Sequence, residues 1–136
     1  MILVDSGVLI AALISTDPAH QRVRAYLGEN RETVGLPAVT IAEIAHFIGK
    51  AGNVYAEARF LRLVAAGTYP LLDPLPVDYL RAANLVEQHA DVPLGTVDAL
   101  IVAMAERFGV TTILTLDQRH FGAVKPLHCE RFVLAP

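Results

Sequence analysis

The sequence predicts an α/β sandwich, in which helices flank a short central sheet that is mostly parallel. Short runs of apolar and β-branched residues alternate with longer segments that carry apolar residues at helical spacing, an order typical of parallel sheets. In addition, four acidic residues each stand where the chain passes into the first turn of a predicted helix. A chain of 136 residues corresponds to about one domain, so we assign residues 1–136 to a single domain.

Prolines, glycines and a capping residue divide the first half of the chain. The segment from Ile2 to Val4 is wholly apolar, as expected of a buried strand. Pro18 opens a more polar helix, and Pro37 ends the next strand. Asn53 is placed to cap a helix that stops at Gly67. The predicted strands are 2–4 and 33–36, and the predicted helices are 8–13, 18–27, 40–49 and 53–67.

The second half of the chain continues the same alternation. Pro74 and Pro76 close a strand, and Gly109 ends a helix that is apolar on nearly every face. The segment from Thr111 to Leu116 is the clearest strand after the first, because it is rich in Thr, Ile and Leu. The predicted strands are 69–72, 111–116 and 131–134, and the predicted helices are 77–89 and 97–108.

Composition limits the classes of partner. The chain is 54% hydrophobic, with a mean hydropathy of +0.45, which leaves apolar surface for a second copy or another chain. Its net charge of −3 argues against binding nucleic acid by charge over the whole surface. Cys129 is the only cysteine, which excludes an internal disulfide framework and a cysteine-based zinc cluster.

Neither export nor a membrane location is expected. The first residues lack a basic region, and Asp5 interrupts the apolar start. The apolar run from Val8 to Ile14 is far shorter than the roughly 20 residues that span a bilayer. We therefore expect a cytoplasmic protein without membrane contact.

The four acidic residues at helix starts are the main functional signal. Helices that follow parallel strands begin near the carboxyl edge of the sheet, where open α/β proteins bind ligands. Carboxylates from four distant segments then meet in one volume, where they repel each other unless a hard divalent cation neutralises them. The pattern predicts a metal site and chemistry on a phosphate. The four residues are Asp5, Glu43, Asp98 and Asp117.

Each acid also has a purely structural interpretation. Asp5 is a good N-cap residue, as is Asp117 at the start of a predicted short helical turn. Thr40-Ile41-Ala42-Glu43 fits a capping box, which makes Glu43 the most ambiguous. Asp98 heads a strongly apolar helix. There the helix dipole stabilises a carboxylate by only about 0.3–1 kcal/mol. Burying an ion without a partner costs several kcal/mol, so the dipole alone does not offset that cost. A protein that only binds partners, with all four acids as caps, is one alternative.

Residues near Asp117 extend the predicted site. Thr115 is placed to turn its hydroxyl toward the same volume, and Arg119 and His120 are candidates for holding a substrate phosphate. The sequence contains no phosphate-binding loop, no dinucleotide-binding glycine motif, no G-x-S-x-G and no H-x-x-x-H pair. The sequence therefore gives no support for a nucleotide-binding loop, for a serine catalytic triad or for a zinc site formed by two histidines of one helix.

Four motifs in order along the chain resemble those of the PIN-domain nucleases, specifically the VapC-type toxins of bacterial toxin–antitoxin pairs. The resemblance covers essentially the whole chain. The motifs are Val4-Asp5-Ser6-Gly7-Val8, Thr40-Ile41-Ala42-Glu43, Val97-Asp98-Ala99-Leu100-Ile101 and Leu114-Thr115-Leu116-Asp117-Gln118-Arg119-His120-Phe121.

The resemblance implies a Rossmann-like PIN fold, a homodimer, endoribonuclease activity on structured RNA with Mg²⁺ or Mn²⁺, and inhibition by a VapB-type antitoxin. It also implies that the four acids form the catalytic quartet. We expect Asp5, Asp98 and Asp117 to be the closest metal ligands, and Glu43 to bind metal or orient the attacking water. Ser6 and Thr115 match positions that support the quartet.

The main alternative is a Mg²⁺-binding phosphoacceptor module that resembles receiver domains and lacks nuclease activity. The Lys125-Pro126 pair resembles one found in such domains. Against this, the chain opens with one acid rather than an adjacent acidic pair, and the mid-chain Asp73 is enclosed by prolines. A haloacid-dehalogenase-like phosphatase is less favoured still, because Asp5-Ser6-Gly7 lacks the second Asp of D-x-D.

Overall fold

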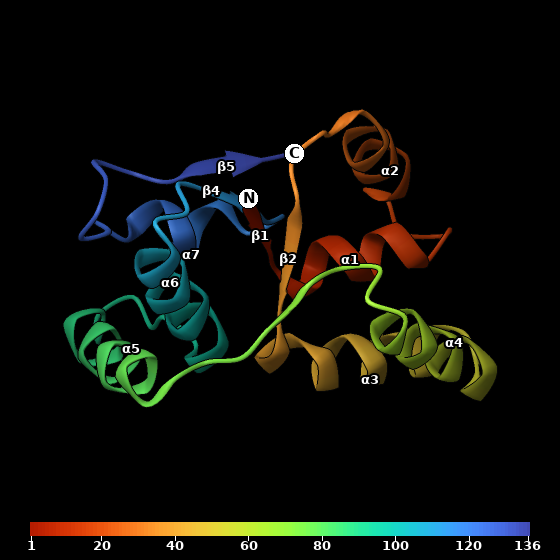
Figure 1. Ribbon diagram of the computed structural model, residues 1–136, viewed down its shortest axis with the longest axis horizontal. Coiled ribbons are helices and arrows are strands. Elements are labelled where there is room, and N and C mark those ends of the chain that lie inside the picture. The colour runs from red at the N-terminus through yellow and green to blue at the C-terminus, as the bar shows by residue number, and fades with distance from the viewer.

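A computed structural model describes all 136 residues and contains one five-stranded sheet in which every neighbouring pair is parallel. The strand order is β3-β2-β1-β4-β5 (Figure 1). The predicted α/β architecture is therefore confirmed, and the sheet is wholly rather than mostly parallel. The strands are β1 (Ile2–Val4), β2 (Val34–Pro37), β3 (Leu71–Leu72), β4 (Thr112–Leu114) and β5 (Val133–Ala135).

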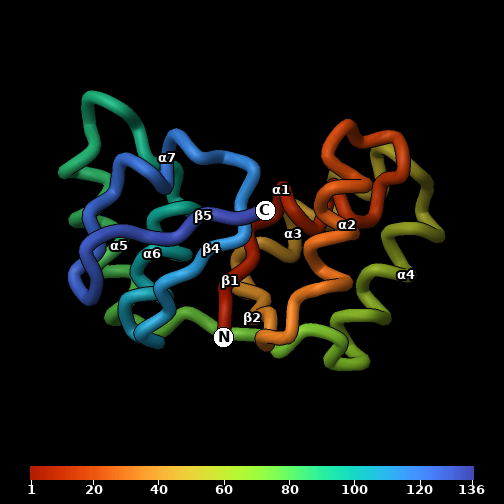
Figure 2. The backbone as a smooth tube through the Cα atoms, turned by 90° about the horizontal axis from the view of Figure 1, so that it is seen from above, coloured from red at the N-terminus to blue at the C-terminus, as the bar shows by residue number.

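Helices cover both faces of the sheet. Helices α1 to α4 lie on one side of it and α5 to α7 on the other, as both views show (Figures 1 and 2). None of the helices combines the length and apolar character needed to cross a bilayer. The helices are α1 (Ser6–Leu13), α2 (His20–Glu29), the 3₁₀ turn η1 (Ala38–Thr40), α3 (Ile41–Ala51), α4 (Val54–Ala65), α5 (Pro76–Gln88), α6 (Thr96–Phe108) and α7 (Gln118–Ala123).

The sheet separates two hydrophobic cores. Side chains alternate between the faces of a strand, so Leu3 and Ile113 pack with α5, α6 and α7, whereas Val4 and Leu114 pack with the helices of the other face. Helix α6 is buried without interruption from residue 99 to residue 105. This burial agrees with its continuous apolar sequence and makes α6 the main packing element of its layer.

Local signals placed the end of each predicted strand and helix within two residues of the observed end. The Asn53 side chain accepts hydrogen bonds from Tyr55 N and Ala56 N at the start of α4, as predicted. Gly109 ends α6 in a left-handed conformation, with φ 66°, which glycine adopts without steric cost. The helix from Gln118 to Ala123 was not predicted beyond a short turn that Asp117 would cap.

Strand β3 is much shorter than the predicted segment 69–72. Only Leu71 and Leu72 pair with β2, because Pro70 and Pro74 bracket them and proline lacks the amide that sheet pairing uses. The carbonyl of Pro70 still accepts a hydrogen bond from Leu36 N at 2.8 Å. The prolines therefore limit the pairing of this edge strand to two residues.

The strand order creates a crevice beside β1. The chain passes from β1 to β2 and β3 on one side, then returns to place β4 and β5 on the other side. The carboxyl ends of β1 and β4 therefore flank a topological switch point, the usual ligand-binding place in open α/β sheets. Asp5 N donates to Leu114 O at 2.8 Å, so the pairing holds to the end of both strands.

Ion pairs fix α6 against α5. The Asp78 side chain, 2% exposed, accepts from Leu75 N at 2.7 Å and from Arg107 Nε at 2.9 Å. One turn further along α5, Arg81 forms two hydrogen bonds with Glu106, at 2.7 and 2.9 Å. Paired and hydrogen-bonded charges of this kind fix the relative placement of two helices. They therefore help to position α6, which carries Asp98 at its other end.

Candidate active site

The four acids predicted from sequence line one pocket at the carboxyl edge of the sheet. The pocket has a volume of about 990 Å³ and is formed by the starts of α1, α3, α6 and α7. We call it the acidic pocket and define it by its four carboxylates. These are Asp5, Glu43, Asp98 and Asp117.

Asp5 is the most buried carboxylate of the acidic pocket, at 8% exposed. It follows β1 and is the N-cap of α1, because its Oδ1 accepts from Ser6 N at 2.7 Å and from Ser6 Oγ at 3.3 Å. Its Oδ2 accepts from Thr115 Oγ1 at 3.0 Å. Burial raises the pKa of Asp5, and these hydrogen bonds partly oppose the rise. Its capping role and its place in the pocket coexist.

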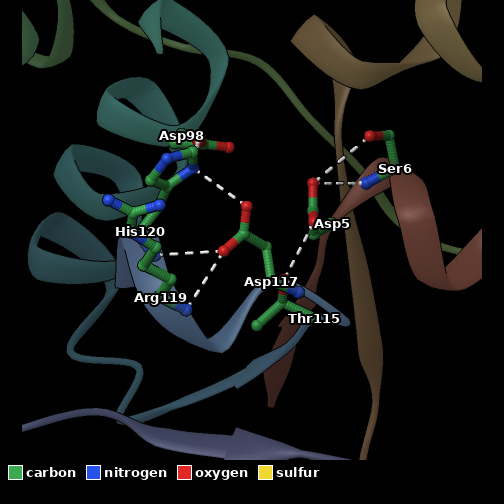
Figure 3. Close-up of polar contacts among 7 residues, drawn as sticks. All are labelled: Asp5, Ser6, Asp98, Thr115, Asp117, Arg119 and His120. Carbon is green, nitrogen blue, oxygen red and sulfur yellow. Dashed lines mark hydrogen bonds and ion pairs between the residues drawn. The ribbon is translucent and has the colours of Figure 1, made fainter. Parts of the chain in front are cut away.

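Thr115 links the end of β4 to both Asp5 and Asp117. Its hydroxyl donates to Asp5 Oδ2 and accepts from Asp117 N at 2.9 Å (Figure 3). Asp117 then caps α7, since its Oδ1 accepts from Arg119 N and His120 N, both at 3.1 Å. Asp117 Oδ2 lies 2.9 Å from the Nδ1 atom of His120. One buried hydroxyl therefore fixes the separation between two of the carboxylate-bearing segments.

Asp98 is the third residue of α6 and caps no backbone amide of that helix. Burial, followed by the negative charge of Asp5, raises the pKa of Asp98 to about 6. His120, with Nδ1 at 3.4 Å, opposes this shift, while Asp117 and Glu43 add smaller increases. The pKa of Asp98 thus responds to the three other acids. The acidic pocket behaves as one electrostatic unit.

The capping-box interpretation of Glu43 is wrong. The 3₁₀ turn η1 precedes α3 and places Thr40 in a helical conformation, so its hydroxyl donates to Pro37 O at 2.8 Å. Thr40 accepts no hydrogen bond from the first turn of α3. Glu43 is exposed, lines the acidic pocket and raises the pKa of Asp5. Two of the four acids are therefore caps and two are not, which also excludes the interpretation of all four as caps.

The donor set of the acidic pocket suits a hard divalent cation, although the side chains do not form a finished coordination shell. No three His, Cys, Asp or Glu side chains are grouped closely enough to hold an ion as they stand. Asp117 is turned toward the amides of α7, and Asp5 toward Ser6 and Thr115. However, the donors are carboxylate oxygens, which suit such an ion, and burial raises the pKa of Asp5 and of Asp98 despite the groups that oppose the rise. Ion binding therefore requires local side-chain rotation.

Some of the other residues that line the acidic pocket were predicted from the sequence, and others were not. Ser6, Arg119 and His120 line it, as expected. Thr96 and Gln118 also line it, although neither was predicted as a site residue. Their only signal was adjacency, since each lies within two positions of a predicted acid. Lys125, which resembled part of a receiver domain, and Asp73, the mid-chain acid weighed against that alternative, both lie elsewhere, since neither lines the pocket.

Comparison with known proteins identifies the family. The PIN domain family matches residues 2–125. Ribonuclease VapC26 of Mycobacterium tuberculosis is 30% identical over 134 residues, which cover 98% of this chain and 99% of that protein.

Solved structures agree with this assignment. VapC20 of Mycobacterium tuberculosis, described as a sarcin–ricin loop cleaving toxin, matches with a TM-score of 0.84 and 14% identity over 96% of this chain and 99% of that one. VapBC2 from Rickettsia felis, bound to a DNA fragment from its promoter, matches with a TM-score of 0.71 and 15% identity over 98% and 97% of the two chains. At these identities, the structural likeness shows a shared fold. With the family match and the relative at 30% identity, it follows that the chain belongs to the PIN-domain family, in its VapC-type branch.

Proposed function

We propose that this protein is a metal-dependent endoribonuclease that hydrolyses RNA phosphodiester bonds and acts as the toxin of a toxin–antitoxin pair. The observation that carries this proposal is the acidic pocket. Four carboxylates from separate segments of a PIN-domain chain line one cavity at the topological switch point. A structural role alone does not account for Asp98 and Glu43, because neither caps its helix.

Asp5, Asp98 and Asp117 would hold Mg²⁺ or Mn²⁺. When bound, the ion would polarise the scissile phosphate and lower the pKa of a coordinated water. Thr115 and Ser6 keep Asp5 oriented through the hydrogen bonds to its two oxygens. Glu43 is exposed at the pocket, so its carboxylate is free to orient or deprotonate the attacking water.

Cationic and polar groups at the mouth of the acidic pocket would bind the RNA backbone. Arg119 is exposed there, and the His120 side chain is 34% exposed. A guanidinium group makes two-pronged contacts with phosphate, and such contacts position an RNA without reading its sequence. The pocket repels phosphate while its carboxylates are uncompensated, so the ion is required for RNA entry as well as for chemistry.

The same proposal includes a VapB-type antitoxin and a homodimer as partners. Several large apolar side chains are exposed, among them Tyr55 at 80% and Leu80 at 70%. A second cavity, of about 760 Å³, is lined mostly by apolar residues of α1, α2 and α4. Exposed apolar area of this kind is typical of protein–protein contact. These surfaces therefore offer room for both partners away from the acidic pocket.

The purified protein is expected to cut RNA in Mg²⁺ or Mn²⁺ and to lose this activity in EDTA, because the carboxylates alone supply no electrophile. The measurement is gel analysis of total cellular RNA, followed by sequencing of the new ends. The control is the Asp5→Asn variant purified in parallel, which detects contaminating nucleases. Cleavage that persists in EDTA, or no cleavage with either ion, would contradict the proposed function.

A further inference from the structure

His120 lies between two carboxylates of the acidic pocket. Its Nδ1 atom is 2.9 Å from Asp117 Oδ2 and 3.4 Å from Asp98 Oδ2 (Figure 3). The two carboxylates come from different helices, Asp98 from α6 and Asp117 from the N-cap of α7. A single ring nitrogen therefore bridges two segments that are far apart in the sequence.

The oxygens that face His120 are those that an ion would need. Asp117 Oδ1 is occupied by the amides of Arg119 and His120, which leaves Oδ2 as its available oxygen. Asp98 makes no hydrogen bond to the backbone of its own helix, and its Oδ2 is the atom nearest the ring. His120 thus occupies the free coordination positions of two of the proposed ligands.

The bridge also completes a continuous series of polar contacts. It runs from Asp5 through the Thr115 hydroxyl to the amide of Asp117, and from the Asp117 carboxylate through the His120 ring to Asp98. Its members come from the ends of β1 and β4, from the start of α7 and from the first turn of α6. Without an ion, His120 is the member that brings α6 into the series.

We propose that His120 is a positioning residue that holds the place of the metal ion between Asp98 and Asp117 and leaves when the ion binds. This inference rests on the proposed metal-dependent function. A divalent ion sits about 2.0–2.2 Å from carboxylate oxygens, so it and a nitrogen at hydrogen-bond distance compete for the same two atoms. The ring is about one-third exposed at the mouth of the pocket, so it has solvent to move into.

Direct coordination of the ion by His120 predicts the opposite effect of a substitution. Magnesium prefers oxygen ligands and is reluctant to give up its waters. If the ring nitrogen were a ligand, its removal would weaken ion binding. If the ring only occupies the ligands' oxygens, its removal would free them and strengthen ion binding.

The test measures Mn²⁺ affinity by electron paramagnetic resonance at one fixed pH. His120→Ala is expected to bind Mn²⁺ roughly three- to tenfold more tightly than wild type, because the contacts of the His120 ring with the two carboxylates no longer have to be broken. His120→Asn is expected to match wild type, because its amide nitrogen is the same number of bonds from the backbone as Nδ1. His89→Ala is the control, since the His89 ring shares a hydrogen bond with Leu85 O at the end of α5 and does not line the acidic pocket.

A second readout separates competition from a general structural effect. The melting temperature of His120→Ala in EDTA is expected to fall below that of His120→Asn, and saturating Mn²⁺ is expected to narrow the difference. If His120→Ala does not fold, His120→Gln replaces it and is expected to bind Mn²⁺ more tightly than His120→Asn, because its amide lies one carbon further out.

The outcomes distinguish this inference from the proposed function. Unchanged or weaker Mn²⁺ binding in His120→Ala, with normal binding by wild type, overturns the role of His120 alone. Equal binding by His120→Gln and His120→Asn overturns it in the same way. Absence of Mn²⁺ binding by wild type overturns both the inference and the metal-dependent function.

Discussion

Asp5→Asn is expected to lower the rate of RNA cleavage by at least about 10²-fold, a loss typical of removing one group that stabilises the transition state, while the protein stays folded. The Asn side chain retains an oxygen that can accept from Ser6 N, so the cap of α1 survives. Burial already raises the pKa of Asp5, so replacing the charge with a neutral amide costs the fold little. What is lost is the charge that would hold the ion. Single-turnover cleavage and urea unfolding measure the two effects separately.

The matched control for Asp5→Asn is Asp17→Asn. Asp17 also accepts a backbone hydrogen bond, from Ala19 N at 2.8 Å, but it does not line the acidic pocket. Its replacement is expected to leave cleavage unchanged. A loss of less than about tenfold would be much smaller than the loss expected for such a group. If Asp5→Asn keeps more than about a tenth of the wild-type rate, Asp5 is therefore not a catalytic ligand.

Asp98→Asn is expected to make the metal-free protein more stable at neutral pH and to remove most of the stabilisation by Mg²⁺. The pKa of Asp98 in the folded protein is about 6, above the ordinary value of 3.8. The carboxyl is therefore ionised at neutral pH in surroundings that disfavour its charge, namely a partly buried position beside Asp5. The neutral amide avoids that cost, but it also removes one of the ion's ligands.

The sign of the pH dependence follows from this raised pKa. Below about pH 3.8 the Asp98 carboxyl is protonated in both the folded and the unfolded chain, and its contribution to stability is complete. As the pH rises through about 6, the folded protein loses that contribution, so the free energy of unfolding of the metal-free wild type decreases. Because Asp98 is partly exposed, the loss is on the order of 1–2 kcal/mol after allowance for solvent screening.

Urea unfolding in EDTA at several pH values, with and without Mg²⁺, measures this prediction. Between pH 4 and pH 6.5, a range that brackets the pKa of about 6, the free energy of unfolding should decrease less for Asp98→Asn than for wild type. Its melting temperature should respond less to Mg²⁺ than that of wild type. Equal stability of the two proteins in EDTA at pH 7, together with equal responses to Mg²⁺, would remove Asp98 from the shared site.

Much of the fold was predictable because its signals are local. Three correct predictions each depended on only a few adjacent residues. They are the strand at residues 2–4, the helix cap at Asn53 and the helix end at Gly109. Helix α7 was harder to predict, since Phe121 is its only buried residue and a helix of six residues has no measurable apolar period. The length of β3 was overestimated, because the prolines on either side of Leu71 and Leu72 limit its pairing with β2 to these two residues.

The meeting of the acids was predictable, whereas their detailed contacts were not. Helix starts gather at one edge of a parallel sheet for topological reasons, and the four predicted acids do line one pocket there. The local pattern around Glu43 was misleading, because the 3₁₀ turn before α3 directs the Thr40 hydroxyl to Pro37 O instead. The bridge by His120 depends on how α7 sits against α6, and no spacing in the sequence specifies that arrangement.

The central claim is that carboxylates from separate segments share one divalent ion. The most direct measurement is anomalous diffraction from crystals of the wild-type protein grown with saturating Mn²⁺. We predict an anomalous peak in the acidic pocket, about 2.0–2.3 Å from oxygens of Asp5, Asp98 and Asp117, with the His120 ring turned away from Asp98. A well-ordered pocket without a peak, or an ion held by only one of these carboxylates, would contradict the claim.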